Sequence, residues 1–253
     1  MSTPGSMPVV PSEQNPPLPE IKRLVNVISD PSATFGDLPR ASRWWSPWLV
    51  VSAASLIFVV LLGQRVGFEQ ISANQIAISS RAEQFDKLPA DQRQQALARS
   101  AVIVRVVSYA SPITLLIVYA ITAGILLGVF NAGMGAQLKF PTMLAIVSYS
   151  SLVHLIGTVL AIVLLVAPGL EPDKYNVANP SGTNIAYYLD PATTNKFLYA
   201  LLSGVDAIVI WSIVLMGIGV ATVSKVKRPT AIVTIAALYL GWKLLTGAMA
   251  AAF

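Results

Sequence analysis

The sequence predicts an all-α, polytopic membrane protein: a bundle of five transmembrane helices preceded by short amphipathic interfacial helices. Of its 253 residues, 55% are hydrophobic and 11% are charged, whereas roughly 25% of residues are charged in a soluble domain. Five apolar stretches are long enough to cross a bilayer core of ~30 Å, which takes about 20 helical residues. Backbone groups must be paired in lipid, and the period-two alternation of β-barrel strands is absent, so these stretches are expected to be helices.

The membrane domain follows two other segments. Residues 1–19 hold six prolines among polar residues, which predicts a disordered tail. Residues 20–43 form an amphipathic segment, and residues 44–253 form the five-span membrane domain. The expected spans cover about 44–63, 106–130, 142–168, 198–223 and 230–252. The first apolar run begins too late for a cleavable signal peptide, so the first span is expected to be an uncleaved anchor.

The first half of the amphipathic segment has an apolar face and a basic one. Its apolar residues recur at helical spacing: Ile21, Leu24, Val25 and Ile28. Beside them, Lys22 and Arg23 supply attraction to anionic lipid headgroups. This pattern predicts a helix that lies on the cytoplasmic leaflet.

The second half of the segment predicts another short helix. Asp30 is placed to N-cap it, with Pro31 at its first position. Phe35 and Leu38 would share one face of that helix. These helices lie on the membrane surface or pack under the bundle, and the two arrangements are compatible.

Aromatic and basic residues predict the orientation of the chain. Trp44, Trp45 and Trp48 cluster at the start of the first span, as residues of an interfacial aromatic belt do. With the N-terminus inside, eight Lys and Arg residues fall on each side, so a simple count decides nothing. The inner ones lie closer to the spans, notably Arg40, Arg43, Lys225, Lys227 and Arg228. We therefore expect a cytoplasmic N-terminus and an outer C-terminus.

Two charged side chains interrupt the spans, namely Asp206 and Lys243. Charged groups inside membranes are functional candidates, because each is costly to insert. Their depths in neighbouring antiparallel spans match, which predicts an intramembrane pair. Two alternatives remain: the pair serves proton or ion coupling, or Lys243 snorkels alone to the outer interface.

Two pairs of glycines predict close helix packing. Gly124 and Gly128 form a Gly-x-x-x-Gly spacing in the second span, and Gly217 and Gly219 lie in the fourth. Small residues at such positions let helix backbones approach each other.

The sequence contains few residues that could form a catalytic or metal-binding site. It has no cysteine and one histidine, which excludes disulfides, thiolate metal sites and two-imidazole metal sites. We find no phosphate-binding loop and no nucleophile elbow. Ser150, Ser151 and His154 share one helix, which favours a local hydroxyl–imidazole hydrogen bond over catalysis. We predict no catalytic residue, no metal, no cofactor and no enzyme activity.

Several local motifs together resemble one family. These are Asp30-Pro31-x-x-x-Phe35, Lys139-Phe140, Ser148-Tyr149, and the stretch from Val205-Asp206 through Trp211 to Gly217-Ile-Gly219. The chain resembles the Yip family of Ypt/Rab-interacting membrane proteins over residues 20–253, and in particular its bacterial branch. The resemblance implies a five-helix bundle with a cytosolic N-terminus in a bacterial inner membrane. The family-motif positions are Asp30, Pro31, Phe35, Tyr149 and Trp211.

The resemblance also bears on partners. Eukaryotic members bind prenylated Rab GTPases in vesicle trafficking, and they carry an Asp-Leu-Tyr-Gly-Pro segment. Here Asp37-Leu38-Pro39 matches that segment poorly, so we do not expect a Rab-type GTPase as partner. The basic residues lie between apolar runs, so the net charge of +5 indicates membrane topology rather than nucleic-acid binding.

Two functions are consistent with these observations. The first is a non-enzymatic membrane scaffold or adaptor, in contact with the lipid bilayer and with protein partners through its cytoplasmic N-terminal segment. The second is a small transporter, channel or lipid-translocating protein that uses Asp206 and Lys243.

Overall fold

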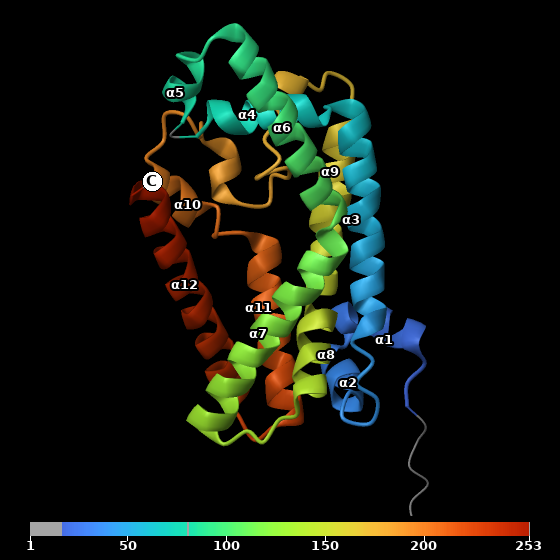
Figure 1. Cartoon of the computed structure of the whole chain (residues 1–253). Helices are drawn as coiled ribbons and strands as arrows, with labels where there is room; N and C mark the ends of the chain where they lie inside the picture. The colour runs from blue at the N-terminus through green and yellow to red at the C-terminus, as the bar shows by residue number, and fades with distance from the viewer. Residues whose placement is uncertain (1–16, 80, 253) are drawn as a thin grey trace, which may run out of the picture.

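The computed structural model describes residues 17–79 and 81–252, and the regular structure in that range is helical (Figure 1). Residues 1–16 of the predicted disordered tail lie outside the described residues. Residues 17–19 lead directly into the first helix, and the Leu18 amide donates a hydrogen bond of 3.0 Å to the Asp37 carboxylate.

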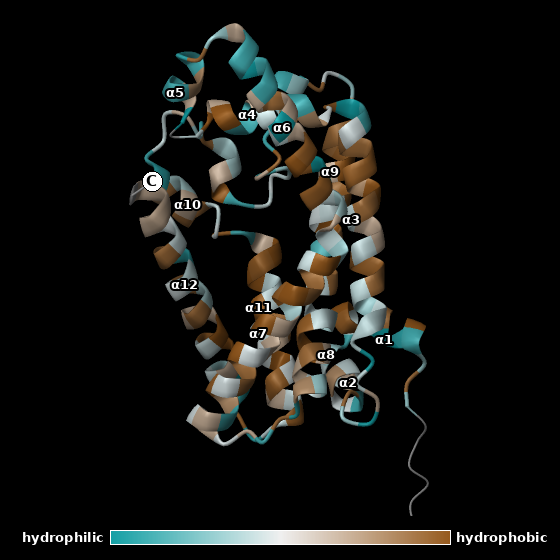
Figure 2. Ribbon diagram, in the orientation of Figure 1, coloured by the Kyte–Doolittle hydropathy of each residue, from teal (hydrophilic) through white to brown (hydrophobic). Residues whose placement is uncertain are grey.

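Four helical segments among the described residues are long and apolar enough to cross a membrane. They are α3 (Trp45–Arg65), α7 (Ser111–Met134), the segment Phe140–Val166, and α12 (Arg228–Ala252). These correspond to the first, second, third and fifth predicted spans. Figure 2 shows hydrophobic residues along these segments, and many of their large apolar side chains are exposed, where a bilayer would cover them.

The second predicted span begins later than expected. Residues 106–109 belong to α6 (Ala90–Tyr109), and the chain breaks at Ala110 before α7 starts. Pro112 explains the break, because its ring removes a helical hydrogen bond and clashes with the preceding turn. α4 (Phe68–Ala77) and α5 (Ala82–Asp86) complete this end of the molecule with α6.

The third span supplies the centre of the bundle. It consists of α8 (Phe140–Ser150), a single tighter turn η1 (Ser151–Val153), and α9 (His154–Val166). Residues 142–153 are buried. The structure shows no hydroxyl–imidazole hydrogen bond among Ser150, Ser151 and His154: the Ser151 hydroxyl donates to the Ser148 carbonyl at 2.7 Å, and the buried Ser150 hydroxyl has no partner among the described residues.

The fourth predicted span is interrupted, and the expectation of one continuous helix over 198–223 is wrong. The chain forms α10 (Lys196–Leu202), a turn over residues 203–206, and α11 (Ala207–Val223). Figure 1 shows α11 beginning well below the upper ends of α3 and α9. At 17 residues, α11 is shorter than the four long segments.

Two short N-terminal helices pack at the end of the bundle opposite to α4, α5 and α6. In α2 (Pro31–Asp37), the Asp30 side chain accepts a hydrogen bond of 3.1 Å from the Ala33 amide, and Pro31 occupies the first turn. That predicted cap is confirmed. Phe35 and Leu38 are fully buried, so α2 packs under the bundle. α1 (Glu20–Ser29) lies beside the first turn of α3 (Figure 1).

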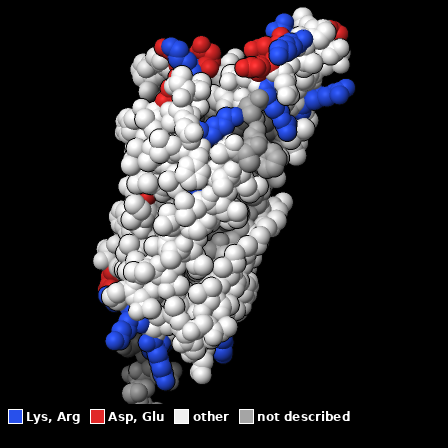
Figure 3. Space-filling model, turned by 90° about the vertical axis from the view of Figure 1, so that its left-hand side faces the viewer, with Lys and Arg blue, Asp and Glu red and all other residues white. Residues whose placement is uncertain are grey.

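Charge separates the two ends of the molecule. Figure 3 shows mainly Lys and Arg at the lower end, which carries α1 and α2, with a small acidic patch at its edge, and a mixture of both signs at the upper end. The upper connection from α9 to α10 contains the short turns η2 (Pro172–Lys174) and η3 (Ile185–Tyr188).

Candidate functional site

The turn between α10 and α11 is built around the Asp206 carboxylate. One of its oxygens accepts hydrogen bonds from the Ile208 and Val209 amides, at 2.7 and 3.2 Å. These amides have no partner within the helix, so Asp206 satisfies them as an N-cap and its negative charge faces the positive end of the α11 dipole. A carboxylate can therefore start a helix inside an otherwise apolar bundle.

The other Asp206 oxygen is held by the upper connection. Thr183 donates its hydroxyl at 2.7 Å, and the Asn184 side-chain amide lies at 3.5 Å. The Ala207 amide donates to the Thr183 carbonyl at 3.0 Å, and Asn184 forms an isolated bridge with Asp206. The non-helical backbone at residues 183–184 is thus hydrogen-bonded to the non-helical backbone at residues 206–207. Non-helical backbone is tolerated inside a membrane only when its polar groups are paired in this way.

α12 supports the same turn from the other side. The Lys243 ammonium donates to the Ser203 hydroxyl at 3.1 Å, and the Tyr239 hydroxyl donates to the Gly204 carbonyl at 3.1 Å. A Cβ at Gly204 would lie 2.5 Å from the Lys243 Cε atom. A larger residue at this position would make the flexible Lys243 side chain move.

The predicted Asp206–Lys243 pair therefore takes an unexpected form. Both side chains hold the 203–206 turn, but their hydrogen bonds go to different groups. The ion pairs among the described residues do not include one between them. We name the residues that build this turn (Thr183, Asn184, 203–206, Tyr239 and Lys243) the broken-helix site.

A second polar cluster fixes α1 and α2 to the bundle. The Arg23 guanidinium contacts the Asp37 carboxylate through two nitrogens, at 2.8 Å from Nε and 2.5 Å from a terminal nitrogen. It also donates to the Ala41 carbonyl at 3.0 Å and lies 3.4 Å from Glu20. Burial by itself lowers the pKa of Arg23, but the hydrogen bonds and charges of Asp37 and Tyr149 together raise the pKa above its ordinary value.

Glu20 connects this cluster to the membrane-spanning helices. One of its oxygens accepts hydrogen bonds from the Ser46 hydroxyl on α3 and the Tyr149 hydroxyl on α8. Tyr149 is fully buried. The side chains Glu20, Arg23, Asp37, Ser46 and Tyr149 form what we name the N-terminal network.

This arrangement corrects one expectation. Arg23 is 1% exposed and its charge is paired with those of Asp37 and Glu20. It therefore cannot attract lipid headgroups as predicted. Lys22 is exposed and remains available for that role. The Glu20–Arg23 spacing of three residues was the available sequence signal for an ion pair on one helix face.

The predicted interfacial and family-motif tryptophans differ in how deeply they are buried. Trp44 and Trp48 are partly buried against the core, and the Trp48 ring nitrogen donates to the Pro112 carbonyl at 2.9 Å. Trp45 is 47% exposed and has the position of a belt residue. Trp211 is exposed on α11 and lies in neither polar cluster.

Comparison with known families decides the identity. The family model of the Yip1 domain matches residues 25–248. The chain belongs to the Yip1 family. No curated relative and no solved structure matches it. The Yip1 match covers the whole broken-helix site, whereas Glu20 and Arg23 of the N-terminal network precede it.

Proposed function

We propose that this Yip1-family protein is a non-enzymatic scaffold that organises the cytoplasmic leaflet through α1. The observation that carries the proposal is an exposed apolar stripe on a helix that is firmly attached to the bundle. Ile21, Val25 and Ile28 are 77, 63 and 43% exposed. They recur at four and three residues, so they lie along one face of α1.

The opposite face of α1 supplies the attachment. Arg23 and Val27 point inward and are buried, and Glu20 bonds to α3 and α8. An amphipathic helix in the headgroup region gains free energy from its buried apolar area and from lipid charge. Because α1 is attached to the bundle, its insertion beside the spanning helices would displace headgroups at a fixed place.

The N-terminus is assigned to the cytoplasm from the distribution of charge. The end with α1 and α2 carries Lys22, Arg40, Arg43, Lys139, Lys225, Lys227 and Arg228, and Figure 3 shows Lys and Arg there. Basic residues close to the spans favour the cytoplasmic side. In this orientation α1 faces anionic lipid, and protein partners would reach the chain through the same N-terminal segment.

The depth of α1 in the bilayer tests the proposal. The chain has no cysteine, so Val25→Cys on the stripe and Asn26→Cys beside it each give one labelling position in the full-length protein. In vesicles containing nitroxide lipids, a fluorophore at position 25 should be quenched more strongly than one at position 26, because successive helical residues point about 100° apart. Equal quenching at both positions contradicts insertion of the stripe.

The scaffold role itself is tested by vesicle shape. We expect the wild-type protein to reduce the mean size of reconstituted anionic vesicles. The triple variant Ile21→Ser, Val25→Ser, Ile28→Ser should lose this effect while keeping the N-terminal network. A variant that reshapes vesicles as the wild type does would reject the scaffold role of α1.

A second candidate function is supported by the broken-helix site. Interrupted helices whose N-terminus points at a polar cluster build ion and substrate sites in transporters. We infer translocation as the alternative, in a small transporter, channel or lipid-translocating protein that uses Asp206 and Lys243. Flux of ions and of fluorescent lipids into proteoliposomes should then fall in Asp206→Asn, which keeps a good N-cap residue and removes only the charge. Absence of flux in the wild type excludes this alternative.

A further inference from the structure

The one histidine of the chain, His154, lies inside a membrane-spanning segment. It begins α9 and is partly buried. Its carbonyl accepts a hydrogen bond from Thr158, but its imidazole makes none with a described residue. Neither the broken-helix site nor the N-terminal network uses this side chain, and an ionisable group inside a membrane is a functional candidate.

Two close contacts fix the register between α11 and the third span. A Cβ at Gly219 would lie 2.6 Å from Ile146, and one at Gly157 would lie 3.9 Å from Ile208. The two contacts are eleven residues apart in α11 and in the third span alike, so the antiparallel segments keep one register over that length. His154 therefore lies level with the second turn of α11.

Two buried hydroxyls near this level have no partner. Ser212 lies in the second turn of α11, is 5% exposed, and makes no hydrogen bond with a described residue. It shares a helix face with Ile208 and Gly219, four and seven residues away, so it points at the third span. Ser150 lies one turn below His154 and is fully buried, and its hydroxyl is also unpaired within the described chain.

A third such hydroxyl comes from α3. The Ser148 hydroxyl donates to the Trp44 carbonyl at 2.7 Å, and the Arg65 Nε atom donates to the Leu165 carbonyl at 3.4 Å. α3 thus runs beside the third span in the same direction. Ser52, eight residues after Trp44, lies level with the first turn of α9, and its buried hydroxyl has no partner in the described chain.

Unpaired groups of this kind indicate bound water. Buried polar groups are nearly always paired, and a buried water needs about two to four polar partners. One imidazole and three hydroxyls, from α3, α8, α9 and α11, meet that need within about two helical turns.

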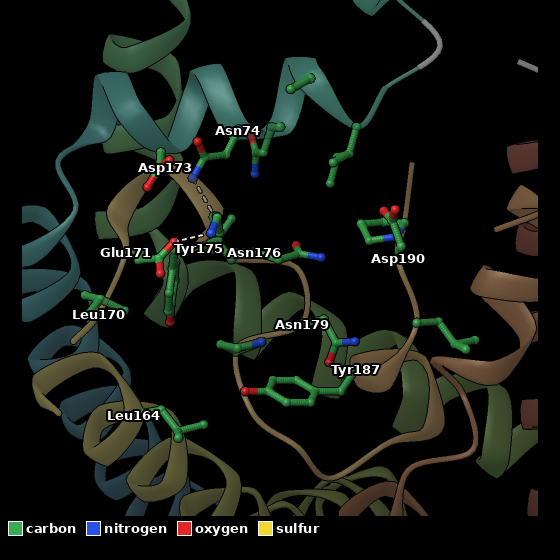
Figure 4. A pocket seen from close by; sticks show the side chains of 18 of the residues that line it. Asn74, Leu164, Leu170, Glu171, Asp173, Tyr175, Asn176, Asn179, Tyr187 and Asp190 are labelled. Carbon is green, nitrogen blue, oxygen red and sulfur yellow. Dashed lines mark hydrogen bonds and ion pairs between the residues drawn. The ribbon is translucent and has the colours of Figure 1, made fainter. Parts of the chain in front are cut away.

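The Asp206 carboxylate connects this level of the bundle to the surface. It precedes α11 and lies six residues, or about 9 Å, above Ser212 along the helix axis. The Asn184 side-chain amide lies 3.5 Å from it, and the Asn179 and Asn184 side chains bond to each other at 2.7 and 3.2 Å. Asn179 lines an open cavity of about 660 Å³ between α4 and the connection from α9 to α10 (Figure 4). Polar side chains thus lead from an aqueous cavity to Asp206.

Asp206 is the negative group nearest to this level. α9 packs mainly against α3 and α11. The titratable side chains of the surrounding elements are Arg65 at the far end of α3, Tyr119 on α7, Tyr149 on α8, Asp206 before α11, and Tyr239 and Lys243 on α12. A carboxylate close to an imidazole favours its protonated form.

We propose that buried water among Ser52, Ser150, Ser212 and His154 makes this imidazole a proton-binding site inside the membrane. The proton arrives from the cavity by way of Asp206 and binds to a ring nitrogen of His154, and the Asp206 carboxylate stabilises the imidazolium that results. The inference goes beyond the scaffold role, because α1 takes no part in it.

Nuclear magnetic resonance of the full-length protein in lipid nanodiscs tests this site. Because the chain has one histidine, ¹⁵N-labelled histidine gives the signals of a single imidazole. We expect this imidazole to titrate between about pH 4 and 9 and to receive magnetisation from water. Asp206→Asn should weaken its proton affinity about tenfold, whereas Asp206→Glu, which keeps the charge, should weaken it less.

Hydroxyl variants test the bound water. The double variant Ser52→Ala, Ser212→Ala should reduce the transfer from water to the imidazole. Ser72→Ala removes a buried hydroxyl of α4 that is bonded to the Phe68 carbonyl and should change neither measurement. An imidazole that keeps one protonation state over the whole range would overturn the proposal. So would equal midpoints in the wild type and Asp206→Asn, or a wild-type imidazole that receives nothing from water.

Discussion

At the scale of single residues, the buried charges decide how this chain is assembled. Arg23 is 1% exposed and is matched by Asp37 and Glu20. An isolated buried charge is costly, whereas a paired and hydrogen-bonded one is tolerated. Each member of the N-terminal network is therefore retained by the others, and α1 cannot leave the bundle without exposing them.

Removing Arg23 should destabilise the protein strongly. Arg23→Ala leaves Asp37 buried without its partner, and breaking such a pair costs about 3 kcal/mol or more. Equilibrium unfolding in detergent measures the change. Replacing both members, as in Arg23→Met with Asp37→Leu, should recover much of the loss. A single Arg23→Ala variant as stable as the wild type would show that the network contributes nothing.

Asp206 and Lys243 should be coupled through the turn that both support. Asp206→Asn and Lys243→Gln each loosen the 203–206 turn. Once one substitution has loosened the turn, the other should cost less stability than it does in the wild-type protein. We expect the double variant to lose less stability than the sum of the single losses, by about 0.5 kcal/mol or more in a double-mutant cycle. Additive losses would mean that the two side chains act independently.

At the scale of elements, small residues decide which helices touch. A Cβ at Gly217 would lie 2.9 Å from the Ile232 Cα atom of α12, and one at Gly219 would lie 2.6 Å from Ile146 of α8. A Cβ at Gly124 or Gly128 meets nothing within 4 Å. The two glycine pairs look alike in the sequence, but the expected close packing is found in the structure only for the pair in α11.

Gly217→Ala and Gly128→Ala form a matched test of this difference. The first forces α11 away from α12 and should cost about 1–3 kcal/mol through overpacking. The second adds a methyl group to open space in a helix and should be neutral or stabilising by up to about 1 kcal/mol. Thermal unfolding in one detergent compares them. Equal effects would contradict the packing described.

At the scale of the whole molecule, the distribution of charge and the order of the helices predict the topology. The basic end carries α1, α2 and the turn before α12 (Figures 1 and 3). With the N-terminus inside and α11 antiparallel to α12, the chain ends on the outer side.

The location of the C-terminus can be measured directly. A reporter that is active only outside the cytoplasm, fused after Phe253, should be active. A reporter that works only in the cytoplasm should be inactive at the same position but active before residue 20. Cytoplasmic activity after Phe253 would reverse the assigned orientation of the last helix.

The sequence alone determined which stretches are helical and apolar, because hydrophobic length is a local property of the chain. It also predicted the Asp30 cap, since capping depends on three neighbouring residues. The tertiary structure alone decided that the fourth span breaks at Asp206, because the groups that pair with that carboxylate come from residues 183 and 184 as well as from α11. The burial of Arg23 was decided in the same way. Its partner Asp37 lies on another helix, and hydrophobic periodicity does not show which polar groups will meet once distant helices have packed.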